Sequence, residues 1–542
     1  MKDFEGTGSG TLAHDSHTGP NIYKVDREPL EDGTENPMYL VKPTISKIAF
    51  TVADNDTMAQ DLAEGKLHLV NKVVYGPTIL ECMGGGGTLT PVDDEKGGEA
   101  VLDGNGLAEE PEATEKAAEE PAEAAEEGAE ETEVAEDGEE DLWADDEEGD
   151  YGTSEETQPK TAPAGEGGAA ADGLQFQNYP RIGLAFFTFT YENPTVHDKE
   201  VRQAMAWCMD RDQLTTDYCG GFGIPVNGYY GIEQWEYLLC TGQLEYPVNF
   251  DLDVVLTPEE EEERAKHANR YARTQEEYDQ MIAAWELLNL DNLTNYNVYD
   301  LENDPERTEK IGIEKAKALL DSAKWTLNRD GEAYDPAKDD VRCKMIDGQL
   351  VALDLTMMYP RGNHIVDTLQ ENWLDNLAEV GIRVTLVPED MEELLKSYYR
   401  EKERTTDMIY LATNFHVIVD PSITYSTDPT PDHLIWNNTY SDDEDLWFRA
   451  VNMRQTHPED IYDYVSKWIS FQERYNEVLP TIPLYSNIYF DFITNQLQNY
   501  HITAHVTWTQ AILESYFGEA PEEAAPAEGE EGEAAEEDDA LF

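Results

Sequence analysis

Hydrophobic and polar positions repeat with two different periods along this chain, and the changes of period mark out predicted strands and helices. Residues 45–53 alternate with the two-residue period of a strand, and residues 56–70 then predict a helix that closes near Gly65, followed by a second strand. The next strand signal is RIGLAFFTFTY at 181–191. Its continuous apolar run is typical of a strand that is covered on both faces.

An amphipathic helix and a glycine-rich loop follow. In HDKEVRQAMAWCMDRDQL (197–214), Asp198 is placed to cap the helix, and Arg202 and Arg211 fall away from its apolar face. The apolar face is made by Val201, Ala204, Met205 and Cys208. The segment CGGFGIPVNG (219–228) then needs permissive backbone conformations. We therefore expect one buried helix that ends in a tight turn.

Helix and strand patterns alternate over the next two hundred residues. Residues 257–290 predict a long, highly charged helix. Further helices are predicted at 313–325, 364–381 and 391–401, and strands at 350–359, 382–390 and 407–415. This alternation over 313–415 indicates α/β layers with a largely parallel sheet.

Composition separates two stretches from the rest of the chain. The formal net charge is −78, and residues 91–173 hold 31 acidic residues against 3 lysines, while residues 519–542 hold 11 acidic residues and no base. Both stretches consist mainly of Glu, Ala, Gly and Pro, so they cannot bury enough apolar surface to offset the entropy of ordering. We expect both to be disordered, as solvated linkers or, alternatively, as a cation-binding surface. The acidity of the remainder argues against a nucleic-acid partner.

Several classes of protein are disfavoured by what the sequence lacks. No run approaches the ~20 apolar residues of a membrane span, and the opening MKDFEGTGSG has no apolar core of a secretory signal. The five cysteines form no CxxC pair, so they predict buried free thiols rather than a disulfide framework or a zinc ribbon. These cysteines are Cys82, Cys208, Cys219, Cys240 and Cys343.

Enzyme motifs are also missing. The sequence contains no HExxH, GxSxG or GxxxxGK, and the GGGG run at 84–87 lacks the lysine of a phosphate-binding loop. His14 and His17 have no partner at a recognised metal-ligand spacing. We therefore expect no enzyme activity, no metal site and no cofactor.

The order of the segments resembles a known family. The segments are KEVRQAMAWCMDRDQL (199–214), GIPVNG (223–228), EKAKALLDSAKW (314–325), DGQLVALDLTMMYPRG (347–362), LQENWLDNLAEVGIRVTLV (369–387), TDMIYLATNF with VDPS (406–422) and YNEVLPTIPLYSN (475–487). Over 181–490 they resemble the extracellular solute-binding proteins of peptide-importing ABC transporters, the oligopeptide- and dipeptide-binding group. The early segment 45–70 fits the same pattern.

The resemblance implies an α/β, two-lobed, periplasmic-binding-protein-like (venus flytrap) fold. Its signal peptide, lipid-anchoring cysteine and first part of lobe one have no counterpart here, so lobe one is expected to be incomplete. The expected division is lobe-one remnant 1–90, acidic insert 91–173, crossing strand 174–192, lobe two 193–485, return to lobe one 486–518, and acidic tail 519–542. The strands of that return should pair with residues 45–75.

The resemblance also indicates where a ligand would bind. The family uses a lobe-two strand end whose Asp pairs with the peptide ammonium, and in TNFHVIVDP (413–421), aligned on Asp420-Pro421, that position is Val417. The candidate ligand-binding residues are Tyr359, Arg361, Asn414, Phe415, His416 and Trp436. The alternative is that these residues only finish strands, lie on the surface or belong to the core.

The function implied is the substrate-binding component of an ABC importer. Such a protein captures a peptide or related solute between its lobes at the extracellular face or in the periplasm, and delivers it to permease subunits. The alternative is a degenerate or split derivative that acts as a non-transporting surface interaction module. Because a buried ammonium without a carboxylate is costly, the ligand is expected to lack a free α-ammonium.

Overall fold

The computed structural model describes residues 21–24, 45, 47–51, 57–84, 168–169, 173–250, 271–272, 274–428, 437–457 and 460–518. All of them belong to one compact unit that comprises residues 1–95 and 161–542. Most of the acidic insert at 91–173 and the acidic tail at 519–542 lie outside the described residues, as does Trp436.

A nine-stranded sheet organises the described residues. Its main path runs β13 (Arg383–Glu389), β12 (Asp354–Pro360), β14 (Met408–Ala412), β6 (Ala185–Phe189), β15 (Thr481–Thr494), β5 (Leu174–Pro180) and β4 (Gly168–Ala169). Strands β12, β13 and β14 are parallel, which confirms the parallel sheet predicted over 313–415. Strand β6 is antiparallel to β14 and to β15.

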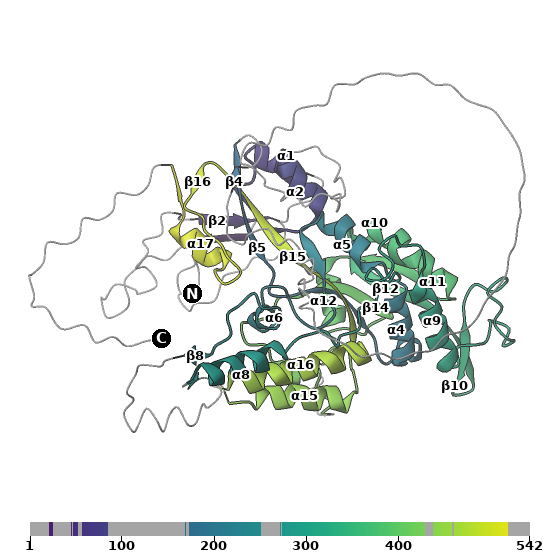
Figure 1. The fold of residues 1–542 in the computed structure, drawn as a ribbon. Helices are drawn as coiled ribbons and strands as arrows, with labels where there is room; N and C mark the ends of the chain where they lie inside the picture. Colours follow the sequence, from purple (N-terminus) through teal and green to yellow (C-terminus); the bar gives the residue numbers. More distant parts are fainter. Residues whose placement is uncertain are drawn as a thin grey trace, which may run out of the picture. The chain divides into compact units, whose positions relative to one another are not determined.

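Strand β15 joins two parts of this sheet (Figure 1). Its first half pairs with β6 and with β7 (Gly223–Pro225), and its second half pairs with β5 and with β3 (Leu69–Val73). All fourteen residues of β15 are buried. The pairing of Phe490 with Val73 confirms that the returning strand meets the early segment.

The segment predicted as one strand at 181–191 is divided. Strand β5 ends at Pro180 and β6 begins at Ala185, so the four residues between them link the two parts of the sheet. Strand β6 is fully buried between β14 and β15. It therefore belongs to the sheet that we assigned to lobe two, and a boundary at residue 193 would remove a central strand from that sheet.

The helix predicted at 197–214 is also two helices, α4 (Lys199–Trp207) and α5 (Arg211–Cys219). Asp210 caps the N-terminus of α5, because its side chain accepts a hydrogen bond from the backbone N–H of Gln213 at 3.1 Å. Asp198 stands at the N-cap position of α4 but does not cap it. Its carboxylate instead accepts hydrogen bonds from Trp325 Nε1 at 3.0 Å and Lys344 Nζ at 2.6 Å.

Both arginines of this region are buried, contrary to the amphipathic pattern. Arg202 donates to the carbonyls of Val478 and Leu479, at 2.7 and 2.9 Å. Arg211 is 1% exposed and donates to the Tyr296 and Val226 carbonyls at 2.7 and 2.8 Å. Each guanidinium satisfies backbone acceptors that no helix or strand partner reaches, so both arginines are structural. After them, Gly220 ends α5 with a left-handed φ of 64°, as the glycine-rich loop predicts.

Helices cover the sheet and enclose an apolar core. The core includes the fully buried Trp325 and Trp373, with Trp373 stacked on Phe187 at 4.8 Å between ring centroids. The covering elements include α9 (Ile311–Ser322), α10 (Ile365–Leu369), the π-helix η2 (Gln370–Leu374), α11 (Asp375–Glu379) and α12 (Met391–Tyr398). Gly381 follows α11 with a φ of 83°, in agreement with the predicted helix stop.

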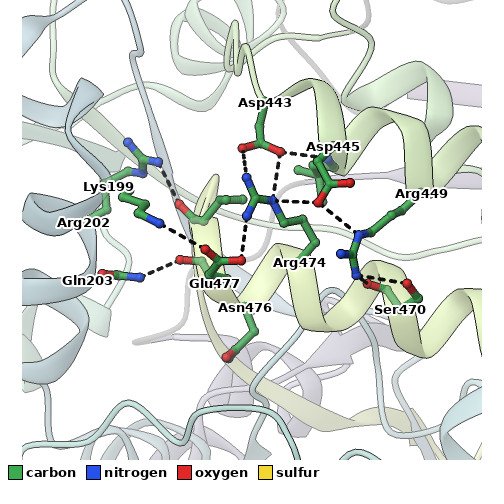
Figure 2. Close-up of polar contacts among 12 residues, drawn as sticks. Lys199, Arg202, Gln203, Asp443, Asp445, Arg449, Ser470, Arg474, Asn476 and Glu477 are labelled. Carbon is green, nitrogen blue, oxygen red and sulfur yellow. Dashed lines mark hydrogen bonds and ion pairs between the residues drawn. The ribbon is translucent and has the colours of Figure 1, made fainter.

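Helices α15 (Glu444–Arg454) and α16 (Ile461–Val478) lie side by side and are tied to α4 by a polar network (Figure 2). Arg474 donates to both carboxylate oxygens of Asp443, at 3.1 and 2.6 Å, and to Glu477 at 2.6 Å. Lys199 of α4 donates to the other oxygen of Glu477 at 3.1 Å. This network holds the C-terminal end of α16 in place, and β15 begins shortly after it.

The remaining elements are short. They are β1 (Asn21–Lys24), β2 (Lys47–Phe50), α1 (Met58–Ala63), α2 (Gly76–Cys82), α3 (Pro194–His197), α6 (Trp235–Cys240), β8 (Asn249–Phe250), β9 (Tyr271–Ala272), α8 (Gln275–Glu286), β10 (Cys343–Ile346), β11 (Gln349–Ala352), α13 (Pro421–Thr424), β16 (Leu497–Gln498), α17 (Trp508–Glu514) and β17 (Tyr516–Phe517). All five cysteines are free thiols, and all but Cys240 are buried. No helix within the described ranges is both long and apolar enough to cross a membrane.

Candidate functional site

The candidate site lies where β15 passes from one set of partner strands to the other. Because side chains alternate along a strand, Asn487, Tyr489 and Asp491 share one face, while Phe490 and Phe492 point into the apolar core on the other. A row of three polar side chains thus lies within the fully buried, largely apolar and aromatic run of this strand. Each of the three is held by groups from a different part of the chain.

Arg181 occupies the link between β5 and β6. It is 5% exposed, and its Nη1 donates to Asn487 Oδ1 at 3.0 Å. Its Nε donates to the Thr413 carbonyl at 3.0 Å and to Asn414 Oδ1 at 3.1 Å. One guanidinium therefore connects the crossover strand to the segment that follows β14.

Tyr489 lies beside two cations. The Cζ atom of Arg181 and the Nζ atom of Lys72 each lie 5.2 Å from the centre of its ring, a distance suited to cation–π attraction. Its hydroxyl donates to Asn414 Oδ1 at 2.9 Å. Burial, followed by the neighbouring positive charge of Arg181, lowers the pKa of Lys72, although Lys72 itself still reaches solvent.

Asp491 is a fully buried carboxylate that is saturated by uncharged donors. Its oxygens accept hydrogen bonds from Tyr500 OH at 2.7 Å, Asn71 Nδ2 at 2.7 Å, the Lys72 amide at 2.8 Å and Tyr179 OH at 3.3 Å. Burial raises its pKa even though these donors act in the opposite direction. Lys72 adopts a left-handed φ of 62°, where the pairing of β3 with β15 shifts register. Such strain in a non-glycine residue is common at functional sites.

Two glycines allow the backbone segments to meet here. A Cβ atom on Gly183 would lie 2.0 Å from the Thr413 carbonyl oxygen, and one on Gly231 would lie 2.2 Å from the Gly183 amide nitrogen. No other residue fits at either position without moving the backbone. These contacts hold Asn414 against the link that carries Arg181.

Of the residues proposed from the sequence, Asn414 belongs to this site. Phe415 packs on Tyr229 at 4.6 Å between ring centroids, and His416 is exposed next to it. Tyr359 lies near the end of the neighbouring parallel strand β12 and Arg361 follows it directly, so both lie at the same edge of the sheet. Arg361 is paired with Asp390 at 2.8 Å on the surface, and no hydrogen bond or ring contact among the described residues joins Tyr359 or Arg361 to Asn414.

The sequence analysis missed Lys72, Arg181, Tyr489 and Asp491. The sequence carries a signal for two of the four: Arg181 is an arginine in an apolar strand pattern, and Asp491 is an aspartate inside the aromatic run IYFDFIT (488–494). A charge at a position that the pattern places in the core needs a partner or a function.

The ammonium position inferred by resemblance carries no carboxylate. Val417 is 58% exposed, and its carbonyl accepts a hydrogen bond from Trp235 Nε1 at 3.0 Å. Asp420, the nearest acidic residue in the chain, caps α13 by accepting from the Ser422 amide at 3.0 Å and lies 3.4 Å from Arg454. Its carboxylate is therefore engaged away from Val417.

Comparison with known proteins now defines the class. The family described as bacterial extracellular solute-binding proteins, family 5, is matched by its middle region over residues 132–432, more than half of the chain. The chain therefore belongs to this family. A search of curated proteins finds no match.

Solved structures agree on the fold. The oligopeptide-binding protein AppA of Bacillus subtilis, in complex with a nonapeptide, has a TM-score of 0.53 at 11% identity, over 95% of this chain and 66% of that one. Lactococcal OppA, complexed with an endogenous peptide in the closed conformation, has a TM-score of 0.51 at 11% identity, over 92% of this chain and 62% of that one. NikZ of Campylobacter jejuni, in complex with Ni(L-His), has a TM-score of 0.50 at 12% identity, over 92% of this chain and 65% of that one. The fold is thus the mixed α/β fold of two-lobed periplasmic binding proteins, and the chain spans less than two thirds of the length of these three structures.

Proposed function

We propose that this chain is the substrate-binding component of an ABC importer, and that it captures a peptide or a related small solute for transmembrane transport. Family membership supports the transport role. By the same membership we propose a location at the extracellular face or in the periplasm, with permease subunits as partners.

The observation that carries the proposal is the polar cluster at the crossover of β15. Arg181, Asn414 and Tyr489 bring together the strand link, the end of β14 and the crossover strand. Two-lobed binding proteins take up ligands between lobes that close about such connecting strands. Lys72 and Asn414 reach solvent there, while Arg181 and Tyr489 are buried beneath them.

The ligand class is proposed from the same segment. AppA and OppA are in complex with peptides, whereas NikZ is in complex with Ni(L-His), so the fold is compatible with more than one kind of solute. Val417 offers no counter-charge to an ammonium group. We propose a solute without a free α-ammonium, such as a blocked peptide.

Isothermal titration calorimetry on the full chain tests the proposal with three probes: tetraalanine, N-acetyl-tetraalanine and the nickel–histidine complex. We expect saturable binding of at least one probe, with the acetylated peptide preferred over the free one. If none binds, the transport role is overturned in favour of the alternative, a non-transporting surface interaction module.

A further inference from the structure

Two cations at the candidate site have no carboxylate partner among the residues that the structure describes. Among the described residues, no Asp or Glu oxygen lies within 4.0 Å of Lys72 Nζ or of the Arg181 guanidinium. By contrast, Lys66 in the same segment pairs with Asp61 at 2.7 Å and with Glu64 at 2.8 Å.

Among the described residues, the acidic side chain whose charge acts on Lys72 is Asp491, and its oxygens are already engaged in hydrogen bonds. Asp491 uses its oxygens to accept from Tyr500, Tyr179, Asn71 and a backbone amide, and none of these donors carries a charge. The Lys72 ammonium is not among its donors. Lys72 and Arg181 together carry one more charge than the Asp491 carboxylate, at a position where Arg181 and Tyr489 are buried and Lys72 reaches solvent.

We propose that Lys72 and Arg181 together bind a carboxylate of the transported solute beside the ring of Tyr489. The inference rests on the proposed function and names the chemical group that the site recognises. Arg181 is held in place by Asn487, Thr413 and Asn414, so its remaining nitrogen, Nη2, which has no acceptor among the described residues, is pre-oriented. A guanidinium fixed in this way suits a planar carboxylate.

Lys72 supplies the second, adjustable contact. Its side chain reaches solvent from the edge of β3, so it can accept an entering ligand, and its left-handed backbone directs its amide to Asp491. Burial and the charge of Arg181 lower the pKa of Lys72 more than the charge of Asp491 raises it, so a further anion beside Lys72 would stabilise its charged form. A bound carboxylate removes this penalty.

The competing explanation is that Arg181 only ties together backbone segments, as Arg202 and Arg211 do. Those two arginines donate mainly to carbonyl oxygens. Arg211 also donates to two side-chain amides, those of Asn227 and Asn295. Arg181 differs because Lys72 lies at the same distance from the same ring and because Lys72 and Asn414 beside it reach solvent. A purely structural arginine makes no distinction between charged and neutral ligands.

The test compares the tightest-binding of the three probes with its carboxamide counterpart, by calorimetry on the full chain. Each probe has a carboxylate, and amidation removes its charge with little change of size. We expect the acid to bind ~10-fold or more tightly than the amide. Lys72→Gln should lose most of this preference, whereas Lys66→Gln, the matched control outside the site, should keep it.

The outcomes separate the two proposals. Equal binding of acid and amide, or an unchanged preference in Lys72→Gln, overturns the carboxylate site while the transport role stands. Failure of every probe overturns the transport role and this inference together. Because Lys72 lies at the surface, its variant is expected to fold, and an unchanged thermal midpoint checks this.

Discussion

The phenolic hydroxyl of Tyr489 donates a hydrogen bond to the side-chain oxygen of Asn414 over 2.9 Å. The two residues are 75 positions apart, and the bond connects the strand that crosses between the two parts of the sheet with the end of β14. A shift of either part relative to the other must stretch it. Under the proposed function, the bond would couple ligand binding to the arrangement of the two parts.

The Tyr489–Asn414 bond should be measurable as a coupling energy. We expect Tyr489→Phe and Asn414→Ala each to lower the free energy of unfolding by about 1 kcal/mol, and the double variant to cost less than their sum. Chemical denaturation of the four proteins gives the cycle. Tyr399→Phe, at an exposed tyrosine, is the control and should leave stability unchanged. Strict additivity would show that the bond contributes nothing.

An anion placed at position 417 should change ligand preference. We expect Val417→Asp to raise the affinity for tetraalanine by ~10-fold, because a carboxylate there can pair with the α-ammonium, and to leave N-acetyl-tetraalanine unaffected. Both Val417 and its neighbour Ile418, 73% exposed, tolerate a charge. Ile418→Asp is therefore the matched control. Tight binding of the free peptide by the unaltered chain, abolished by acetylation, would contradict the expectation.

Glu236 should make stability fall as the pH rises. It is fully buried, and its Oε2 has no hydrogen-bond partner among the described residues. Burial raises its pKa from 4.5 to about 7, against the opposing hydrogen bonds from its own backbone and from Tyr464. Between these two values the folded chain keeps a proton that the unfolded chain has lost. The contribution of the protonated Glu236 to the free energy of unfolding is fully present below pH ~4.5, and about 3 kcal/mol of it is lost by pH ~7.

The Glu236→Gln variant isolates this effect. It cannot ionise, so the difference in unfolding free energy between variant and unaltered chain should shift in favour of the variant from pH 4.5 to 7.5. Glu371→Gln, at an exposed position, controls for the loss of a carboxylate. A constant difference across this range would contradict a buried, protonated Glu236.

The network of Figure 2 should contribute more to stability than a surface ion pair of similar composition. Arg474 and Asp443 are each only 21% exposed and are joined by two hydrogen bonds, whereas Arg454, which lies 3.4 Å from Asp420, is 57% exposed. We expect Arg474→Gln to lower the free energy of unfolding by about 1–2 kcal/mol and Arg454→Gln by less than about 0.5 kcal/mol. Equal effects in thermal or denaturant unfolding would refute this ranking.

The local pattern of hydrophobic and polar residues was sufficient to predict the helices and strands that lie between residues 311 and 415. The helical spacing that buries Ile313, Ala316 and Leu320, and the glycine stop at Gly381, act over a few residues and are visible in the sequence. The same holds for the parallel strands β12 and β14, whose apolar runs reflect burial, whereas β13 lies at the end of the described sheet path and is partly exposed. The order of these segments was enough to indicate the family.

Most residues of the candidate site could be identified only from the tertiary structure. Asn414 was proposed because TNFHVIVDP resembles the family's ligand-binding segment. Lys72 and Asp491, by contrast, lie more than 400 positions apart and meet only because β3 pairs with β15. In the sequence, Arg181 looks like part of a strand. The structure shows that β5 ends one residue earlier, at Pro180, so Arg181 lies in the link between β5 and β6. Hydrophobic periodicity reports which face of an element is buried. It carries no information on which distant polar group will share that interior, because that depends on strand pairing across the whole chain.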